Sequence, residues 1–355
     1  MKLGLIGLPQ VGKRTLFQLL TGKNGGSNGG KNNGLGLAKV RDERFQRLVE
    51  MYRPSLETPA FMDFVLLPDL GQQPESDAQI LRALEKVDVI CHLVRAFEDD
   101  RIFHVEGSVN PGRDILRLNE ELRLNDLLFI EKRLERLEKE RGKKNDARKT
   151  ALERDLMTRM GEHLESGHFL RTYPFTEEED QLTTGYPLLT RKALLVILNA
   201  GEDWTADRQG AEGLVERFAR EDFQWFAVSA KIEQELSLLK AEDRQAFMED
   251  LQIRQPALDR LTLLCFRLLG LISFFTVGTD EVRAWTVRQG TPAPQAGRVI
   301  HSDVERGFIR AEVMKFEDLV GMGSEQKVRE AGRLIQKGRD YLVEDGDILN
   351  FLFHI

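Results

Sequence analysis

One nine-residue segment near the start of the chain constrains the fold more than any other. It reads Gly7-Leu8-Pro9-Gln10-Val11-Gly12-Lys13-Arg14-Thr15, follows an apolar run from Leu3 to Ile6, and precedes a helical pattern from Leu16 to Leu20. The two glycines let successive backbone N–H groups turn inward around a phosphate, and the lysine reaches the outer phosphates of a nucleotide. A strand, such a loop and a helix in this order predict a phosphate-binding loop.

Further apolar runs rich in β-branched residues predict the sheet that carries this loop. They extend over Phe61 to Leu67, Val87 to Val94, Ala193 to Leu198 and Phe223 to Val228, and helical patterns lie between several of them. Strands buried on both faces read as continuous apolar runs of this kind. The alternation predicts an α/β layered domain with a parallel sheet, whose ligands bind at the carboxyl ends of the strands.

Two other regions have a different character. From Asn119 to about Arg171 leucines recur at helical spacing with charges between them, and the basic turn Lys143-Lys144-Asn145 follows Gly142. This pattern predicts two antiparallel helices that form a coiled hairpin. From about Phe274 onward, apolar residues alternate with polar ones and glycines recur at turns, which predicts a small mixed-sheet domain.

The composition narrows the classes of function. A chain of 355 residues, 41% of them hydrophobic, is long enough for two or three domains. Its formal net charge of -7 argues against the whole-surface basic field that gives non-specific nucleic-acid binding, so we expect no DNA partner, although a local basic patch is compatible with this charge. The cysteines are Cys91 and Cys265, both in apolar runs, so we expect a reducing cytoplasm and neither disulfides nor a cysteine metal site. No apolar run is long enough to span a membrane.

The phosphate loop departs from its usual pattern where magnesium binds. Ser or Thr normally follows the lysine and ligates Mg²⁺ through its hydroxyl, but here that residue is Arg14. Thr15 comes one residue late, about 100° around the helix, so it does not take over the ligand directly. Either the Arg14 guanidinium lies against the phosphates and replaces part of the metal's charge, or the loop is a relic that binds nothing.

Several motifs beyond the loop carry a family resemblance. They are Val94-Arg95-Ala96-Phe97-Glu98-Asp99-Asp100, Glu281-Val282-Arg283-Ala284-Trp285-Thr286, Ala293-Pro294-Gln295-Ala296, Ile300-His301-Ser302-Asp303, Gly307-Phe308-Ile309-Arg310-Ala311 and Asp345-Gly346-Asp347. With them the chain resembles the Obg-like ATPase (YchF) family over essentially its whole length. The resemblance implies a P-loop NTPase domain over residues 1–115 and 186–273, an inserted α-helical coiled hairpin over 116–185, and a C-terminal ubiquitin-like (β-grasp, TGS) domain over 274–355.

The resemblance also implies how the base is recognised. The family has Asn-x-x-Glu where most related GTPases have Asn-Lys-x-Asp, and here the motif is Asn199-Ala200-Gly201-Glu202. An Asp at the last position accepts hydrogen bonds from guanine, so its replacement makes adenine tolerable. Ser229-Ala230-Lys231 resembles the loop that packs on the base. The alternative for both segments is a plain turn between a strand and a helix.

Other departures concern hydrolysis. Where the family has Asp-x-x-Gly, Leu66 stands at the Asp position and Asp69 at the Gly position. Asp69-Leu70-Gly71 either approaches the site in a shifted register or forms an ordinary turn, which is the commoner outcome. Residues 22–36 contain no threonine that would hold a γ-phosphate and metal.

The resulting expectation is a purine nucleotide-binding protein with weak or absent hydrolysis. The ligand is ATP or GTP, with ATP favoured and Mg²⁺ doubtful, and the sequence identifies no catalytic residue and no metal ligand. The resemblance implies ribosome or ribosomal RNA as partner. Lys and Arg outnumber Asp and Glu from Glu131 to Lys149, which marks either an RNA contact or a solvated helix face. The alternatives are a slow ATPase or GTPase, and an adaptor that works without nucleotide.

Overall fold

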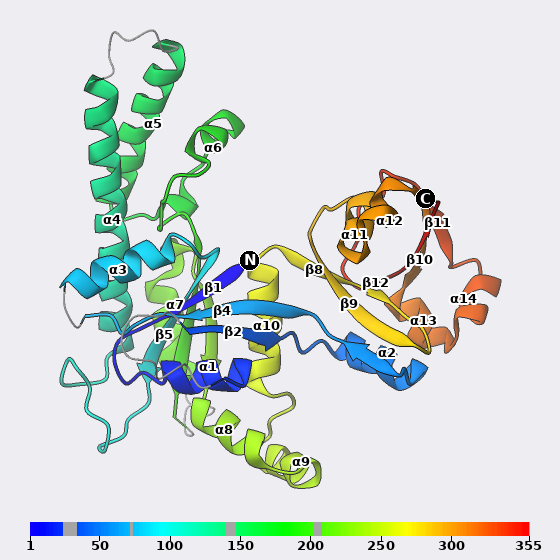
Figure 1. Cartoon of the computed structure of the whole chain (residues 1–355). Helices are drawn as coiled ribbons and strands as arrows, with labels where there is room; N and C mark the ends of the chain where they lie inside the picture. The colour runs from blue at the N-terminus through cyan, green and yellow to red at the C-terminus, as the bar shows by residue number, and fades with distance from the viewer. Residues whose placement is uncertain (24–33, 72–73, 140–146, 202–207, 355) are drawn as a thin grey trace. The chain divides into compact units, whose positions relative to one another are not determined.

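The computed structural model describes residues 1–23, 34–71, 74–139, 147–201 and 208–354. The chain divides into two compact units, and Figure 1 shows their elements along the sequence. The first unit comprises Met1–Gly36 and Asp63–Ala257, and the second comprises Leu37–Met62 and Leu258–Ile355. Within the described residues, no helix is long and apolar enough to cross a membrane.

A parallel sheet forms the centre of the first unit. It contains β1 (Lys2–Ile6), β4 (Phe61–Leu66), β5 (Val89–Ala96), β6 (Ala193–Ala200) and β7 (Gln224–Val228) in the order β4-β1-β5-β6-β7, and β2 (Gly34–Lys39) joins it beside β4. β1 pairs in parallel with both β4 and β5, β5 pairs with β6, and β6 pairs with β7. Nearly every residue of β5 and β6 is buried, which is why these strands read as continuous apolar runs. The predicted parallel-sheet P-loop NTPase fold is confirmed.

Helices lie between these strands in the sequence and after the last of them. They are α1 (Lys13–Thr21), α3 (Pro74–Leu84), α7 (Arg208–Arg217), α8 (Ala230–Leu238) and α9 (Ala241–Asp250). In α1, Leu16, Phe17 and Leu20 are buried at spacings that place them on one face, so the helix packs against the sheet by that face. Because β1 and α1 flank residues 7–12 directly, the sheet fixes both ends of the phosphate loop.

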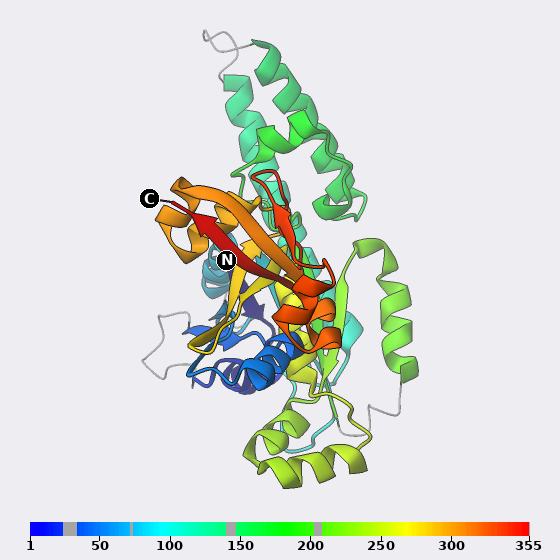
Figure 2. The ribbon, with the colours of Figure 1, turned by 90° about the vertical axis from the view of Figure 1, so that its right-hand side faces the viewer.

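An antiparallel helical pair is inserted between β5 and β6. Figures 1 and 2 both show α4 (Pro111–Lys139) and α5 (Ala147–Glu165) side by side, with α6 (Glu177–Thr183) after them. Residues from both long helices form one apolar core, which includes Ile130, Leu137, Leu156, Met157, Met160 and Leu164. The predicted coiled hairpin is therefore present, and its basic turn at residues 143–145 lies outside the described part of the chain.

A buried carboxylate fixes the base of this hairpin. Asp126 of α4 accepts hydrogen bonds from the backbone N–H groups of Leu189 (2.9 Å) and Thr190 (2.8 Å) and from the Thr190 hydroxyl (2.7 Å). Burial raises the pKa of Asp126, and these hydrogen bonds oppose that rise. The contact joins the middle of α4 to the segment that returns the chain to β6.

The second unit is built on a mixed sheet. Its strands are β3 (Leu56–Thr58), β8 (Leu271–Thr276), β9 (Glu281–Arg288), β10 (Phe308–Lys315), β11 (Ile335–Lys337) and β12 (Asp347–Phe353), in the order β11-β10-β12-β8-β9-β3. β8 runs antiparallel to β9 and parallel to β12, and α11 (Ala293–Ile300) packs on the sheet. This is the predicted C-terminal β-grasp domain. Trp285 and Phe308 lie in its core and the half-buried Phe351 packs against it, as their alternating pattern predicts.

Shorter elements complete this unit. They are α2 (Glu43–Tyr52), α10 (Ala257–Leu268), α12 (Ser302–Arg306), α13 (Phe316–Met322) and α14 (Glu325–Glu330). The Tyr52 hydroxyl donates to Glu325 (2.6 Å), and Arg44 forms an ion pair with Asp345 (3.0 Å). β3 pairs in parallel with β9. These contacts explain why residues 37–62 group with the C-terminal strands although they are distant in sequence.

Candidate functional site

The loop between β1 and α1 has the backbone geometry of an anion cradle. A Cβ added to Gly7 would lie 2.3 Å from the backbone oxygen of Leu93, so no side chain fits there. Gln10 (φ 59°) and Gly12 (φ 93°) adopt left-handed conformations that fold the loop back on itself. Gly12 also caps the N-terminus of α1, where the first backbone N–H groups of the helix point outward. Such a turn at a helix N-terminus binds anions.

Lys13 directly follows this loop as the first residue of α1, and its ammonium group has three partners. Its side chain is 4% exposed, and Nζ donates to the backbone oxygens of Gly7 (3.0 Å) and Pro68 (2.8 Å) and pairs with Asp69 Oδ1 (2.8 Å). Burial lowers the pKa of Lys13, the Asp69 carboxylate opposes that effect, and the charge of Arg14 lowers it further. Of the two alternatives for residues 69–71, the structure has the one in which Asp69 approaches the loop.

The segment that carries Asp69 is fixed to the phosphate loop by its backbone. The N–H of Leu70 donates to the oxygen of Gly7 (3.2 Å), and the N–H of Leu67 donates to the oxygen of Leu5 (3.0 Å). The Leu70 side chain is 2% exposed. The N–H of Gly71 donates to Asp77 Oδ1 (2.9 Å) at the start of α3. Asp69 therefore lies in a segment whose backbone is bonded to the phosphate loop and to α3. Its side chain is 31% exposed.

Asn199 links the phosphate loop to the first residue of α8. It is the next-to-last residue of β6 and its side chain is buried; its Nδ2 donates to the backbone oxygen of Val11 (2.9 Å), and its Oδ1 accepts from the N–H of Ala230 (3.0 Å). Ser229 caps α8 by accepting from the N–H of Ile232. An amide nitrogen carries two hydrogens, and within the described residues the Asn199 nitrogen donates one of them, to Val11. A Cβ on Gly12 would lie 2.5 Å from this nitrogen, which is a second reason for glycine there.

The other residues singled out from the sequence lie around this junction. Pro9 and Thr15 are half-buried and Val11 is buried, whereas Gln10, Arg14 and Lys231 are exposed. Arg14 is close enough to Lys13 for its charge to lower the lysine pKa. Glu202 lies outside the described residues. Across the described ranges, no group of three or more His, Cys, Asp or Glu side chains is arranged to hold a metal ion.

The sequence did not show the structural roles of two buried polar residues of β5, His92 and Arg95. His92 lies next to Ile6 in the sheet, and its Nδ1 has no hydrogen-bond partner in the described structure. Burial, and then the charge of Lys13, lower the pKa of His92 to about 3. Arg95 donates to the backbone oxygens of Phe97 (3.1 Å) and Ile102 (3.0 Å), so it holds the segment after β5. A polar residue inside an apolar run gives no sequence signal of these contacts.

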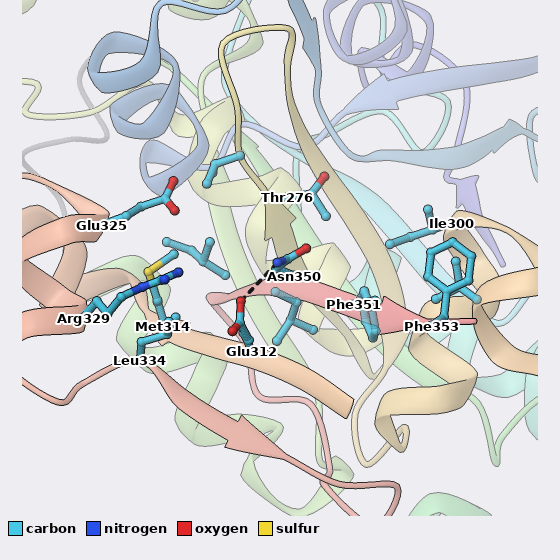
Figure 3. Close-up of a pocket in the computed structure, with 14 residues that line it drawn as sticks. Thr276, Ile300, Glu312, Met314, Glu325, Arg329, Leu334, Asn350, Phe351 and Phe353 are labelled. Carbon is cyan, nitrogen blue, oxygen red and sulfur yellow. Dashed lines mark hydrogen bonds between the residues drawn. The ribbon is translucent and has the colours of Figure 1, made fainter. Parts of the chain in front are cut away.

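The second unit contains a hollow of about 440 Å³ beside β10 and β12. Figure 3 shows Glu325 and Arg329 of α14 at one end and Ile300 and Phe353 at the other. Between them the Asn350 amide donates to Glu312 (3.1 Å). The lining mixes apolar surface with charges of both signs, so its chemistry does not point to one class of ligand.

Known proteins are similar to this chain over its whole length. Residues 271–354 match the family model YchF-GTPase_C, described as "Protein of unknown function (DUF933)". The chain is 38% identical to the ribosome-binding ATPase YchF of Bacillus subtilis over 99% of both chains. It is 36% identical to Obg-like ATPase 1 of Rattus norvegicus, over all of this chain and 92% of that one.

Solved structures give the same result. The YchF GTPase of Schizosaccharomyces pombe superposes with a TM-score of 0.86 at 30% identity, over 99% of this chain and 97% of that one. A GTP-binding protein of Pyrococcus horikoshii, at 15% identity and a TM-score of 0.58, shares the fold. Full-length identity above 30%, together with the loop, the hairpin and the C-terminal domain, shows that the chain belongs to the YchF/Obg-like ATPase family.

Proposed function

We propose that this chain binds a purine nucleotide at the loop of residues 7–15, with ATP favoured over GTP and with weak or absent hydrolysis. The observation that carries the proposal is the conformation of the loop itself. Gly7 leaves no room for a side chain, Gln10 and Gly12 turn the backbone inward, and Lys13 stands at its mouth. This arrangement fits the phosphates of a nucleotide.

The residues have separate tasks in this proposal. The backbone N–H groups of residues 10–13 hold the inner phosphates, and the lysine ammonium faces the outer ones. Asn199 is bonded to Val11 and to Ala230, so it orients residues 229–231, which would pack on the base. Its second amide hydrogen would be donated to the edge of the base. The preference for adenine rests on Glu202 in place of the Asp that accepts from guanine.

The residues present do not fit magnesium in the way the family resemblance implies. Arg14 stands where a hydroxyl would ligate the ion, and Leu66 stands where a carboxylate would support it. Phosphoryl transfer depends on neutralising the charge that develops on the phosphates. Asp69 brings a negative charge to the lysine that would serve this purpose. These features support binding without efficient turnover.

Calorimetric titration tests this proposal. ATP and GTP, each with Mg²⁺ and with EDTA, are titrated into the wild-type chain and a Lys13→Ala variant. We expect saturable binding that is stronger for ATP, unchanged by EDTA and lost in the variant. Binding that requires Mg²⁺ would mean that a carboxylate has taken over the metal, which supports a cycling ATPase. No binding of either nucleotide would leave an adaptor that works without nucleotide.

We also infer that the chain associates with ribosomes in the cytoplasm through the helical hairpin. Relatives at 36–38% identity are named ribosome-binding ATPases, and the exposed side chains of Lys132, Arg136 and Lys139 recur three and four residues apart on α4. A row of cations on one helix face suits the RNA backbone.

Sedimentation with ribosomes tests this inference. Replacement of Lys132, Arg136 and Lys139 by Glu should release the protein at a lower salt concentration than the wild type. A matched control replaces the exposed Lys86, Arg220 and Lys240 by Glu, with the same change in net charge at other sites of the first unit. Equal loss in both variants would show that net charge, not the hairpin, governs the association.

A further inference from the structure

We propose that Asp69 occupies the position of the outermost phosphate, so that the site accepts a nucleoside diphosphate in preference to a triphosphate. The inference rests on the proposed nucleotide site and specifies which state of the nucleotide it takes. It concerns the length of the phosphate chain, whereas the choice of adenine over guanine concerns the base.

The hydrogen-bonding capacity of Lys13 is fully used in this structure. An ammonium group has three donors. All three have partners at 3.0 Å or less, namely the backbone oxygens of Gly7 and Pro68 and the Asp69 carboxylate. A phosphate that binds Lys13 must therefore replace one of them. The two carbonyls belong to the loop and to the adjoining segment, so the carboxylate is the partner that an anion competes with.

The Asp69 carboxylate contacts the group that would otherwise bind an outer phosphate. In a loop of this kind the lysine reaches the outer phosphates, and the backbone N–H groups hold the inner ones. Asp69 Oδ1 lies 2.8 Å from the same ammonium nitrogen, and its side chain is 31% exposed, whereas that of the lysine is 4% exposed. An outer phosphate that reached Lys13 would meet a carboxylate of like charge.

The backbone around Asp69 is held by hydrogen bonds and by burial. Leu70 is buried and bonded to Gly7, Leu67 is bonded to Leu5, and Gly71 is bonded to Asp77. The backbone on both sides of Asp69 is thus fixed to the loop or to α3. A triphosphate has to turn the Asp69 side chain away from Lys13, whereas a diphosphate held in the backbone cradle leaves the pair intact.

Titrations with ADP and ATP, both in EDTA, test the proposal on the full-length wild type and on Asp69→Asn and Asp69→Ala. We expect the wild type to bind ADP about tenfold more tightly than ATP, and both variants to lose most of this ratio by gaining affinity for ATP. Glu75→Gln removes an exposed carboxylate from the first turn of α3 and should keep the wild-type ratio. Thermal melting of each variant checks that it is folded.

The outcomes separate the two claims. Equal affinity of the wild type for ADP and ATP, unchanged in both Asp69 variants, would overturn this inference and leave the nucleotide site standing. Absence of binding by either nucleotide in every variant would overturn the proposed site itself. The titrations are repeated with Mg²⁺. If Asp69 ligates the metal, replacement of Asp69 weakens the binding of ATP instead of strengthening it, and that result would also contradict the proposal.

Discussion

The amide nitrogen of Asn199 lies 2.9 Å from the backbone oxygen of Val11, so the end of β6 is bonded directly to the phosphate loop. The same side chain accepts from Ala230 at the start of α8. Segments separated by 188 and 31 residues in sequence therefore meet at one buried amide. Asn199 supports the shape of the whole site before any ligand binds.

Replacement of Asn199 by Ala should destabilise the protein and weaken binding of both ATP and GTP. The change leaves the Val11 carbonyl and the Ala230 N–H buried without partners, at a combined cost of about 2–4 kcal/mol. Chemical denaturation measures this cost. Asn350→Ala removes an exposed amide and should change the free energy of unfolding by less than about 0.5 kcal/mol. A loss of affinity without loss of stability would mean that Asn199 contacts only the ligand.

A methyl group at Gly7 should be poorly tolerated. The new Cβ would lie 2.3 Å from the Leu93 oxygen, which is backbone of β5 and cannot rotate away. We expect the free energy of unfolding to fall by about 2–3 kcal/mol. Gly213→Ala provides the control, because a Cβ there meets open space in α7 and should stabilise the helix by about 0.5–1 kcal/mol. Similar stabilities of Gly7→Ala and wild type would contradict the packing described here.

His92 should make the protein less stable in mild acid. Its pKa is lowered to about 3 in the fold, first by burial and then by Lys13, so the unfolded chain binds a proton that the folded chain does not. Stability is therefore lost as the pH falls below the unfolded value of about 6.5, by about 1.4 kcal/mol per pH unit. Between about pH 7.5 and about pH 5, the wild type should lose about 2 kcal/mol more than His92→Phe.

Urea unfolding at the two pH values measures this difference. His354→Asn, which removes an exposed imidazole near the C-terminus, should follow the wild type. If the free energies of unfolding of the wild type and His92→Phe fell equally between the two pH values, His92 would bind its proton as readily in the folded protein as in the unfolded chain.

The sequence predicts the architecture because local features specify it. The apolar runs of β5 and β6 and the glycines of residues 7–12 act over a few residues, and the leucine spacing of α4 and α5 needs no distant partner. The contact between Lys13 and Asp69 is different, because it joins two segments through the parallel pairing of β1 with β4, in which Leu5 lies opposite Leu66. Periodicity does not fix such a register, so the sequence left an ordinary turn as the commoner alternative.

One feature of each sheet could not be predicted from the sequence, because it depends on residues that are far apart in the chain. β3 has three residues, two of them exposed, and its pairing with β9 depends on a strand more than 200 positions later. His92 stands among apolar residues of β5, and only the structure shows that it lies near Lys13. The adenine preference rests on Glu202, outside the described residues, and stays a prediction.

The most direct test of binding without efficient hydrolysis is phosphate release from ATP at concentrations that saturate the site by calorimetry. The wild type and Lys13→Ala are compared with and without Mg²⁺ in the same preparation. We predict that the saturated wild type releases phosphate no faster than Lys13→Ala. Magnesium-dependent release over many turnovers, abolished in Lys13→Ala, would contradict this account and show that the site supports catalysis without the usual hydroxyl and carboxylate.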